Sequence, residues 1–208
     1  MLVVCAGTAT DVGKTFVGAA ALAELRRRGH TVSARKPAQS HDPAVDGPLD
    51  AALLAASTGE PVDEVCPPHR TYALPMAPPM AAAALGQPGP TLTALVAELA
   101  WPDPYPDVRW VELVGGPRSP LAVDGDGVDL TDAISADRVV LVADAGLGTI
   151  NSVSLSVAPF AALGHRPVVM LNRYDPEVDL HRRNWTWLTE RSGCPVVTDS
   201  VALADALL

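Results

Sequence analysis

A short segment near the N-terminus carries the residue types that bind phosphate. Residues 7–15 read Gly-Thr-Ala-Thr-Asp-Val-Gly-Lys-Thr and stand between an apolar run and a helical pattern. Glycines let a backbone wrap closely around an anion, and a helix N-terminus offers unpaired N–H groups. This setting indicates a phosphate-binding loop, in which Lys14 would reach the β- and γ-phosphates of a nucleotide and Thr15 would join a magnesium shell. The standard spacing has glycine where Thr8 stands, and Gly7 comes one residue earlier.

Lysine is rare in this chain, which has Lys14 and Lys36 against thirteen arginines. A lysine offers a compact point charge with freely rotating donors, whereas an arginine offers a bulky planar fork. Both lysines follow predicted strands, so they should lie at the edge where parallel strands end and where open α/β sheets bind ligands. We interpret Lys36 as a second functional cation; the alternative is an ordinary surface lysine.

Two acidic residues are placed to help bind magnesium, which prefers hard oxygen ligands. Glu112 ends a predicted strand and is followed by Gly115 and Gly116, while Asp50 begins a predicted helix. Asp50 also has a simpler interpretation, as an acid that stabilises the N-terminus of its own helix.

The elements that must position these residues follow from apolar runs that alternate with helical patterns. Buried strands are predicted at 2–6, 31–36, 108–114, 138–143, 167–171 and 195–198, and helices at 14–28, 49–58, 92–99, 151–163 and 180–191. This order predicts a mostly parallel sheet with helices on both faces and right-handed crossovers. Proline-rich stretches at 61–79 and 102–106 are predicted to be loops, and the 208 residues suit a single domain.

Composition excludes several classes of function. The formal net charge of -9 argues against nucleic-acid or membrane-surface binding, because no extended basic surface would neutralise phosphates. Three widely spaced cysteines have no metal-ligand pattern and indicate reduced thiols. No targeting segment or membrane-length apolar stretch is evident, so we expect a cytoplasmic protein.

Several of these segments together resemble the dethiobiotin synthetase family. The similar segments are residues 7–15, 35–40, 50–51, 111–112 with 115–116, and 146–151, and matching segments run from residue 2 to about residue 172. The family's loop carries the same extra residue before its Gly-Lys-Thr, which accounts for the unusual spacing. The resemblance implies a single-domain, P-loop NTPase-like three-layer fold, and a homodimer.

The resemblance also implies roles for individual residues. ATP would contact the following: Thr8, Asp11, Val12, Gly13, Lys14, Thr15, Phe16 and Asn172, the last at the adenine. Magnesium would be held by Thr15, Asp50 and Glu112. The substrate would contact the following: Thr10, Lys36, Ser40, Gly115, Gly148, Thr149 and Asn151. Lys14 and Lys36 would be the catalytic residues. The helix after Gly148 would receive the substrate's carboxylate across the dimer interface; ordinary capping by Thr149 or Asn151 is an equally good interpretation.

The implied reaction joins a vicinal diamine, 7,8-diaminopelargonic acid, to CO2 at the expense of ATP. One amine becomes a carbamate, the carbamate attacks the γ-phosphate, and the second amine closes a cyclic urea on the mixed anhydride. Charge stabilisation and positioning dominate such phosphoryl transfer, so paired lysines and magnesium suit it.

This chain departs from the family pattern after Glu112. Family members usually have glycine and a small residue where this chain has Leu113 and Val114, so we expect these two branched side chains to narrow or reshape the substrate pocket. Arg118 either meets an additional anionic group or is a solvated loop residue.

Three other functions stay open on the sequence. The chain could act on another amine by the same chemistry, or bind nucleotide without catalysis. It could also be a nucleotide-switched ATPase that binds a partner, although such ATPases carry an additional lysine early in the loop, where this chain has Thr8, Ala9 and Thr10.

Overall fold

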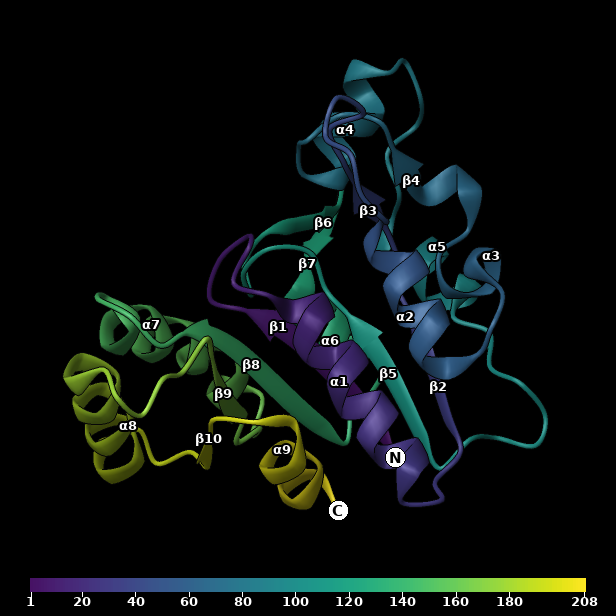
Figure 1. The fold of residues 1–208 in the computed structure, drawn as a ribbon. Coiled ribbons are helices and arrows are strands. Elements are labelled where there is room, and N and C mark those ends of the chain that lie inside the picture. Colours follow the sequence, from purple (N-terminus) through teal and green to yellow (C-terminus); the bar gives the residue numbers. More distant parts are fainter.

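The computed structural model describes the whole chain, Met1–Leu208, and its centre is a six-stranded parallel sheet. The strand order is β10-β9-β8-β1-β5-β2 (Figure 1). The strands are β1 Leu2–Gly7, β2 Val32–Arg35, β5 Val108–Glu112, β8 Arg138–Asp144, β9 Val168–Asn172 and β10 Val196–Val197. Two small two-stranded sheets stand apart from it, β3 Gln39–Ser40 with β4 Thr71–Tyr72 and β6 Pro120–Ala122 with β7 Gly125–Asp126.

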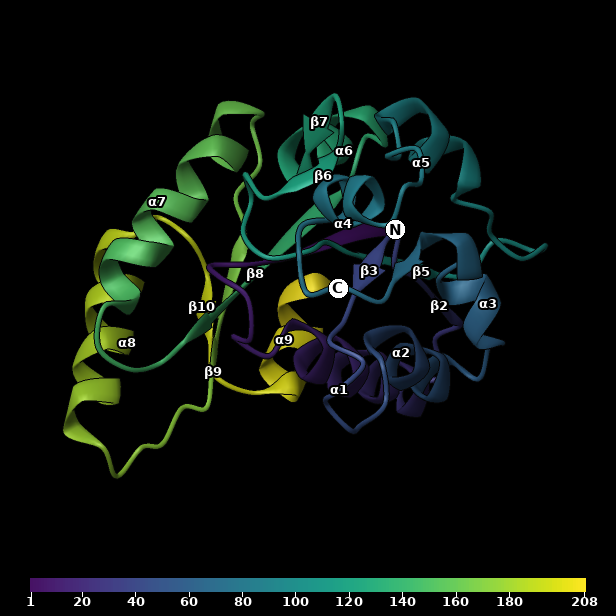
Figure 2. The ribbon, with the colours of Figure 1, turned by 90° about the horizontal axis from the view of Figure 1, so that it is seen from above.

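Helices cover both faces of the large sheet (Figure 2). One face packs against α1 Lys14–Arg27, α2 Asp50–Thr58, α3 Val62–Val65 and α9 Ser200–Leu207. The other face packs against α4 Pro78–Ala84, α5 Leu92–Glu98, α6 Gly127–Ala133, α7 Thr149–Ala162 and α8 Asp179–Arg191. A short 3-10 helix, η1 Pro68–Arg70, precedes β4.

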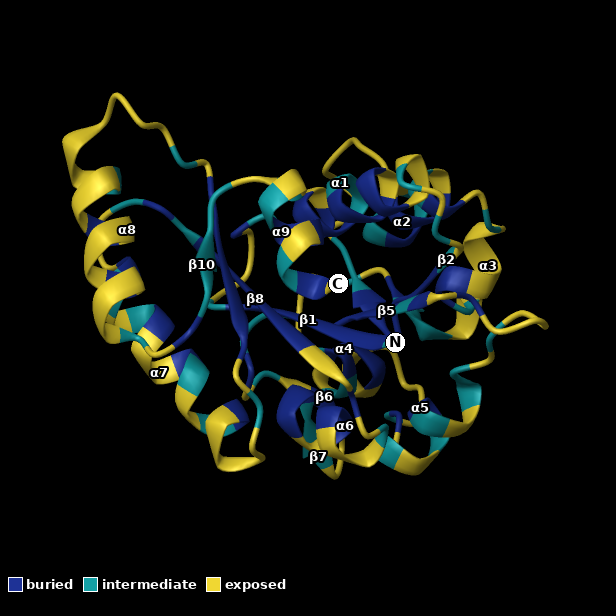
Figure 3. Ribbon diagram, turned by 90° about the horizontal axis from the view of Figure 1, so that it is seen from below, coloured by how far each residue is buried: buried dark blue, intermediate teal, exposed yellow.

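The strands are buried on both sides because successive side chains point to opposite faces. In β1, Val3 and Cys5 belong to the core under α1 and α2, whereas Val4 and Ala6 belong to the core under α6 and α7. Figure 3 shows the central strands buried and the outer helix faces exposed. The sheet is therefore a rigid platform whose carboxyl edge presents the loops after β1, β2, β5, β8 and β9.

The predicted fold class is confirmed, and each of the six predicted strands is found in the large sheet. The segment 61–79, predicted to be loop, instead contains α3, η1, β4 and the start of α4. Three helices of seven or eight residues, α4, α6 and α9, were not predicted. A signal for α6 was present: Asp126 and Asp129 form a capping box, in which each carboxylate accepts from the other residue's backbone N–H.

The structure also shows the environments of the arginines at the end of α1 and of the three cysteines. The arginine run at the end of α1 is paired, since Arg27 and Arg28 both bind Glu24, at 2.7 Å. The hydrogen bonds from these guanidinium groups hold the pKa of Glu24 at about 2. All three cysteines are free and buried. None of the helices combines the length and the apolar character that crossing a membrane requires.

Candidate nucleotide-binding and active site

The predicted phosphate loop connects β1 to α1 and is held in an open turn. Gly13, immediately before α1, has φ 90°, a left-handed conformation that favours glycine. A Cβ at this position would come within 2.1 Å of Asn172 Nδ2. The loop is also tied to the sheet, because the N–H of Thr8 donates to Val142 O at 2.8 Å. The backbone of the loop thus comes close to its neighbours only because residue 13 has no side chain.

A compact polar cluster lies beside this loop, and all of its members except the partly exposed Asp50 are buried. Lys36, directly after β2, donates to Glu112 Oε1 at 2.6 Å and to Asp50 Oδ2 at 2.7 Å. Thr15 Oγ1 donates to the same Glu112 oxygen at 2.7 Å. Lys36 is 2% exposed and Glu112 is fully buried. The structure therefore brings together Thr15, Lys36, Asp50 and Glu112, four residues from four separate segments of the chain.

The charges of this cluster are strongly coupled. Burial alone would lower the pKa of Lys36, but Glu112 and Asp50 outweigh it and raise that pKa above its usual value. Burial would raise the pKa of Asp50, yet Lys36 holds it below the ordinary range. The pKa of Lys14 is lowered, first by burial and then by the neighbouring charge of Lys36. Lys36 is accordingly a permanent ammonium ion at neutral pH, and Lys14 is a second cation that lacks a carboxylate partner of its own.

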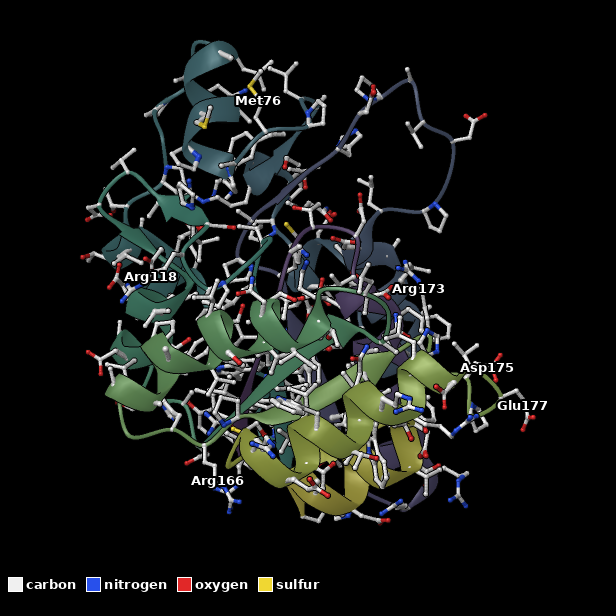
Figure 4. The ribbon with its side chains drawn as sticks, turned by 90° about the vertical axis from the view of Figure 1, so that its left-hand side faces the viewer. Met76, Arg118, Arg166, Arg173, Asp175 and Glu177 are labelled. Atoms are coloured by element: carbon white, nitrogen blue, oxygen red, sulfur yellow. The ribbon has the colours of Figure 1, made fainter.

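Three members of the cluster, Thr15, Lys36 and Asp50, line the floor of a cavity of about 800 Å³, and the fully buried Glu112 lies behind them. The lining of this cavity includes Thr10, Asp11, Gly13, Lys14 and Thr15 from the phosphate loop, together with Lys36, Ser40, Asp50 and Gly115. The opposite wall is formed by segment 45–49 and by residues 75–78, and Figure 4 shows Met76 in this upper part of the molecule. Charged residues of both signs line this cavity together with apolar ones such as Val45, Leu49 and Met76, which suits a charged molecule with an aliphatic part.

The two branched residues after Glu112 have different positions. Val114 lines the cavity, so it narrows the space there as expected. Leu113 does not: it is fully buried in the core, and its side chain lies against Gly127. The expectation that both residues shape the pocket was wrong for Leu113, because side chains alternate between opposite sides of an extended backbone.

Several predicted site residues lie outside the cavity lining: Thr8, Val12, Phe16, Glu112 and Asn172. Asn172 is buried and its Nδ2 donates to Val12 O at 2.9 Å, whereas the side chain of Phe16 is 70% exposed. Ser40 lines the cavity, but its hydroxyl donates to Met76 O at 2.6 Å.

The loop before α7 is at the same sheet edge but does not line the cavity. Gly148 directly precedes the helix with φ 92°, Thr149 is its first residue, and Asn151 is exposed. The Thr149 hydroxyl is buried and has no hydrogen-bond partner, and neither Thr149 nor Asn151 caps the helix through its side chain. Ordinary capping therefore does not explain these two residues in the structure.

Arg118 is a surface residue that does not face the cavity. It binds Asp126 at 2.9 Å and Asp129 at 3.7 Å and lies at the margin of the molecule in Figure 4. A different arginine, Arg173, does line the cavity, and sequence reasoning did not find it. The one available signal was its place directly after Asn172, at the end of a predicted strand.

The fold and the site together define a P-loop nucleotide-binding α/β protein. A family model described as an AAA domain matches residues 2–199. Two solved structures share this fold. One is a putative plasmid partition protein from Borrelia burgdorferi B31 bound to AMPPNP, with TM-score 0.52, 11% identity, and coverage of 95% of this chain and 86% of that one. The other is the signal recognition particle receptor FtsY from Elizabethkingia anophelis in complex with GDP, with TM-score 0.54, 14% identity, and coverage of 99% and 62%.

Comparison with sequence relatives identifies one family within this class of P-loop proteins. The chain is 37% identical to the ATP-dependent dethiobiotin synthetase BioD of Haloferax mediterranei over 92% of its own length and 80% of the relative's. It is also 37% identical to the proteins of the same name from Xanthomonas axonopodis pv. citri, over 91% and 85%, and Rhodococcus erythropolis, over 92% and 84%. The chain belongs to the family of ATP-dependent dethiobiotin synthetases, which confirms the resemblance.

Proposed function

We propose that this protein is an ATP- and magnesium-dependent ligase that carboxylates a vicinal diamine with CO2 and closes a cyclic urea. The leading substrate is 7,8-diaminopelargonic acid and the product dethiobiotin. The observation that carries the proposal is the placement of both lysines of the chain, Lys14 and Lys36, at the floor of one cavity beside the phosphate loop. The relatives' printed name, ATP-dependent dethiobiotin synthetase, supports the same reaction.

The phosphate loop is the part that would bind ATP. Its N–H groups and the start of α1 provide donors for phosphate oxygens, and Lys14 adds a cation. In the structure the Lys14 ammonium reaches back to Ala9 O at 3.3 Å, so it is held by one weak contact and is free to turn toward a phosphate. Its lowered pKa would return toward the ordinary value beside a phosphate anion.

The chemistry of the cluster also fits magnesium. Thr15, Asp50 and Glu112 supply the hard oxygen atoms that this ion prefers, and Glu112 Oε2 is buried without a partner. A bound magnesium ion would neutralise charge on the β- and γ-phosphates during phosphoryl transfer. Lys36 already lies between Asp50 and Glu112. Thr15, Asp50 and Glu112 would therefore hold the ion together with phosphate oxygens and water, and would not surround it by themselves.

Lys36 would act through its charge. Its raised pKa keeps it protonated, so it is neither a base nor a nucleophile at neutral pH. A fixed ammonium at the cavity floor stabilises a carbamate and the anionic transition state of its phosphorylation, because the donor is oriented before the reaction begins. The hydroxyl of Ser40, which also lines the cavity, would contact the carbamate once it is released from Met76 O.

The first test measures phosphate release from ATP and magnesium in the presence of bicarbonate, with and without 7,8-diaminopelargonic acid. Release should require the diamine, bicarbonate and magnesium together, and the Lys36→Met variant should lose it. Arg138→Ala is the matched control, because Arg138 lies at the start of β8, at the sheet edge away from the site. ATP binding without diamine-dependent release would refute dethiobiotin synthesis by this protein.

A related ligase acting on another amine is the second candidate, and Val114 is the observation that favours it. Its branched side chain lines the cavity, where it reduces the space for the substrate. Comparing a series of diamines on the wild type and on Val114→Gly separates the two candidates. If the Val114→Gly variant turns over 7,8-diaminopelargonic acid and the wild type does not, the natural substrate of this chain is a different and smaller amine.

A further inference from the structure

Asn172, the last residue of β9, and Arg173, which follows it, hold the phosphate loop through two consecutive carbonyl groups. Asn172 Nδ2 donates to Val12 O at 2.9 Å, and Arg173 Nη2 donates to Asp11 O at 2.9 Å. The side chain of Arg173 also lines the cavity. Figure 4 shows Arg173 beside the purple N-terminal segment, at the level where the strands end.

These contacts fix the direction of two backbone donors. In a planar trans peptide the C=O and the N–H point in opposite directions. Holding the carbonyl of Asp11 therefore aims the N–H of Val12 away from Arg173, and holding the carbonyl of Val12 aims the N–H of Gly13 away from Asn172. Neither N–H donates to a protein acceptor, so both are available to a phosphate.

The conformation of the loop requires such support. Asp11 and Arg173 have φ 60° and φ 57°, in the left-handed region that is unfavourable for residues other than glycine. The two strained residues contact each other directly. The contact therefore stabilises a loop shape that a free chain would leave.

Asp144 anchors the arginine to the sheet. Asp144 ends β8 and is paired in register with Asn172, so Arg173 follows at the same edge. Its Oδ2 binds Arg173 Nη1 at 2.9 Å, and its Oδ1 accepts from the N–H of Gly146 at 2.8 Å. One guanidinium thus bridges a rigid strand end to the phosphate loop.

We propose that Arg173, held by Asp144, is a positioning residue for ATP: it orients the Asp11–Val12 peptide so that the N–H of Val12 points into the phosphate cradle. This inference rests on the proposed function only in assuming that this loop binds the phosphates of ATP. It predicts an effect on nucleotide affinity that does not depend on which amine is the substrate.

The test is the dissociation constant of ATP with magnesium, measured by calorimetry on the purified chain. Arg173→Ala should weaken ATP binding about two- to fivefold, because the Arg173 side chain is 59% exposed and its contacts compete with water. In turnover, the KM for ATP should rise while kcat at saturating ATP and the KM for the amine stay nearly constant. Arg183→Ala is the control, because Arg183 binds only Asp179 on its own helix.

Asp144→Asn distinguishes positioning from simple charge attraction. It removes a negative charge near the nucleotide, so a purely electrostatic role of Arg173 predicts tighter ATP binding in this variant. Loss of the anchor predicts weaker binding.

Weaker ATP binding in both variants, with unchanged melting temperature, supports the proposal. Tighter binding in Asp144→Asn, or unchanged binding in Arg173→Ala, overturns it. If the wild type binds ATP and Arg173→Ala binds it more weakly, but no diamine supports turnover, the proposed function fails and this inference stands.

Discussion

The contact between Lys36 and Glu112 makes a prediction about stability that is independent of catalysis. Lys36→Met keeps the volume of the side chain but leaves Glu112 fully buried without its cation. Removing one partner of a buried ion pair costs about 3–5 kcal/mol. For a chain of this length, each kcal/mol lowers the melting temperature by about 2–4 °C, so a fall of roughly 6–20 °C is expected.

Replacing the other partner of this ion pair, Glu112, should destabilise the protein less. In Glu112→Gln, Lys36 keeps Asp50 at 2.7 Å, and Asp50 is partly open to solvent. We therefore expect Glu112→Gln to destabilise the protein less than Lys36→Met. The double variant, which has neither charge, should be more stable than Lys36→Met alone.

Urea denaturation of the wild type, both single variants and the double variant measures the coupling free energy between the two residues. Additive effects of the two substitutions would refute the interpretation that Lys36 and Glu112 form a coupled ion pair. The same measurement shows whether loss of activity in a Lys36 variant reflects chemistry or unfolding.

Three further predictions concern other parts of the chain. Gly13→Ala should lower the melting temperature and weaken ATP binding more than tenfold, because a Cβ would meet Asn172 Nδ2 at 2.1 Å in a left-handed backbone; unchanged ATP affinity in calorimetry would contradict this. Glu60→Gln should cost about 1–3 kcal/mol at pH 7, since Glu60 accepts from Arg35 at 2.8 Å. The pKa of Glu60 in the fold is lowered despite burial. This stabilisation is therefore complete above the unfolded pKa of about 4.3 and is lost as the pH falls through the folded pKa. A stability difference between wild type and Glu60→Gln that stays constant from pH 7 to 3 in urea titrations would count against this prediction. Asp126→Ala should lower the melting temperature by about 2–4 °C, through loss of roughly 1 kcal/mol of capping at α6, and an unchanged melting curve would show that the cap contributes nothing.

The phosphate loop and the large sheet could be predicted from the sequence because their signals are local. Apolar runs bounded by turn residues marked the six strands, and the Gly13–Lys14–Thr15 sequence marked the loop. The region 61–79 could not be predicted in this way. Its elements are only two to four residues long before α4 begins, which is too short for a periodic pattern to be distinguished from a loop.

The candidate site likewise has features that the sequence predicts and features that only the fold decides. The sequence by itself determined which side chains could serve an anion: two lysines after strand ends, a hydroxyl after the loop, and acids at Asp50 and Glu112. Only the tertiary structure decided that Lys36 lies between both acids, that Val114 lines the cavity while Leu113 is in the core, and that Arg173 holds the loop. The reason is physical: residue type fixes the charge and the donors of a side chain, but its partners depend on strand order and on the face to which the backbone turns it. Arg173 and Asp11 are 162 positions apart, and they meet only because β1, β8 and β9 are neighbours in the sheet.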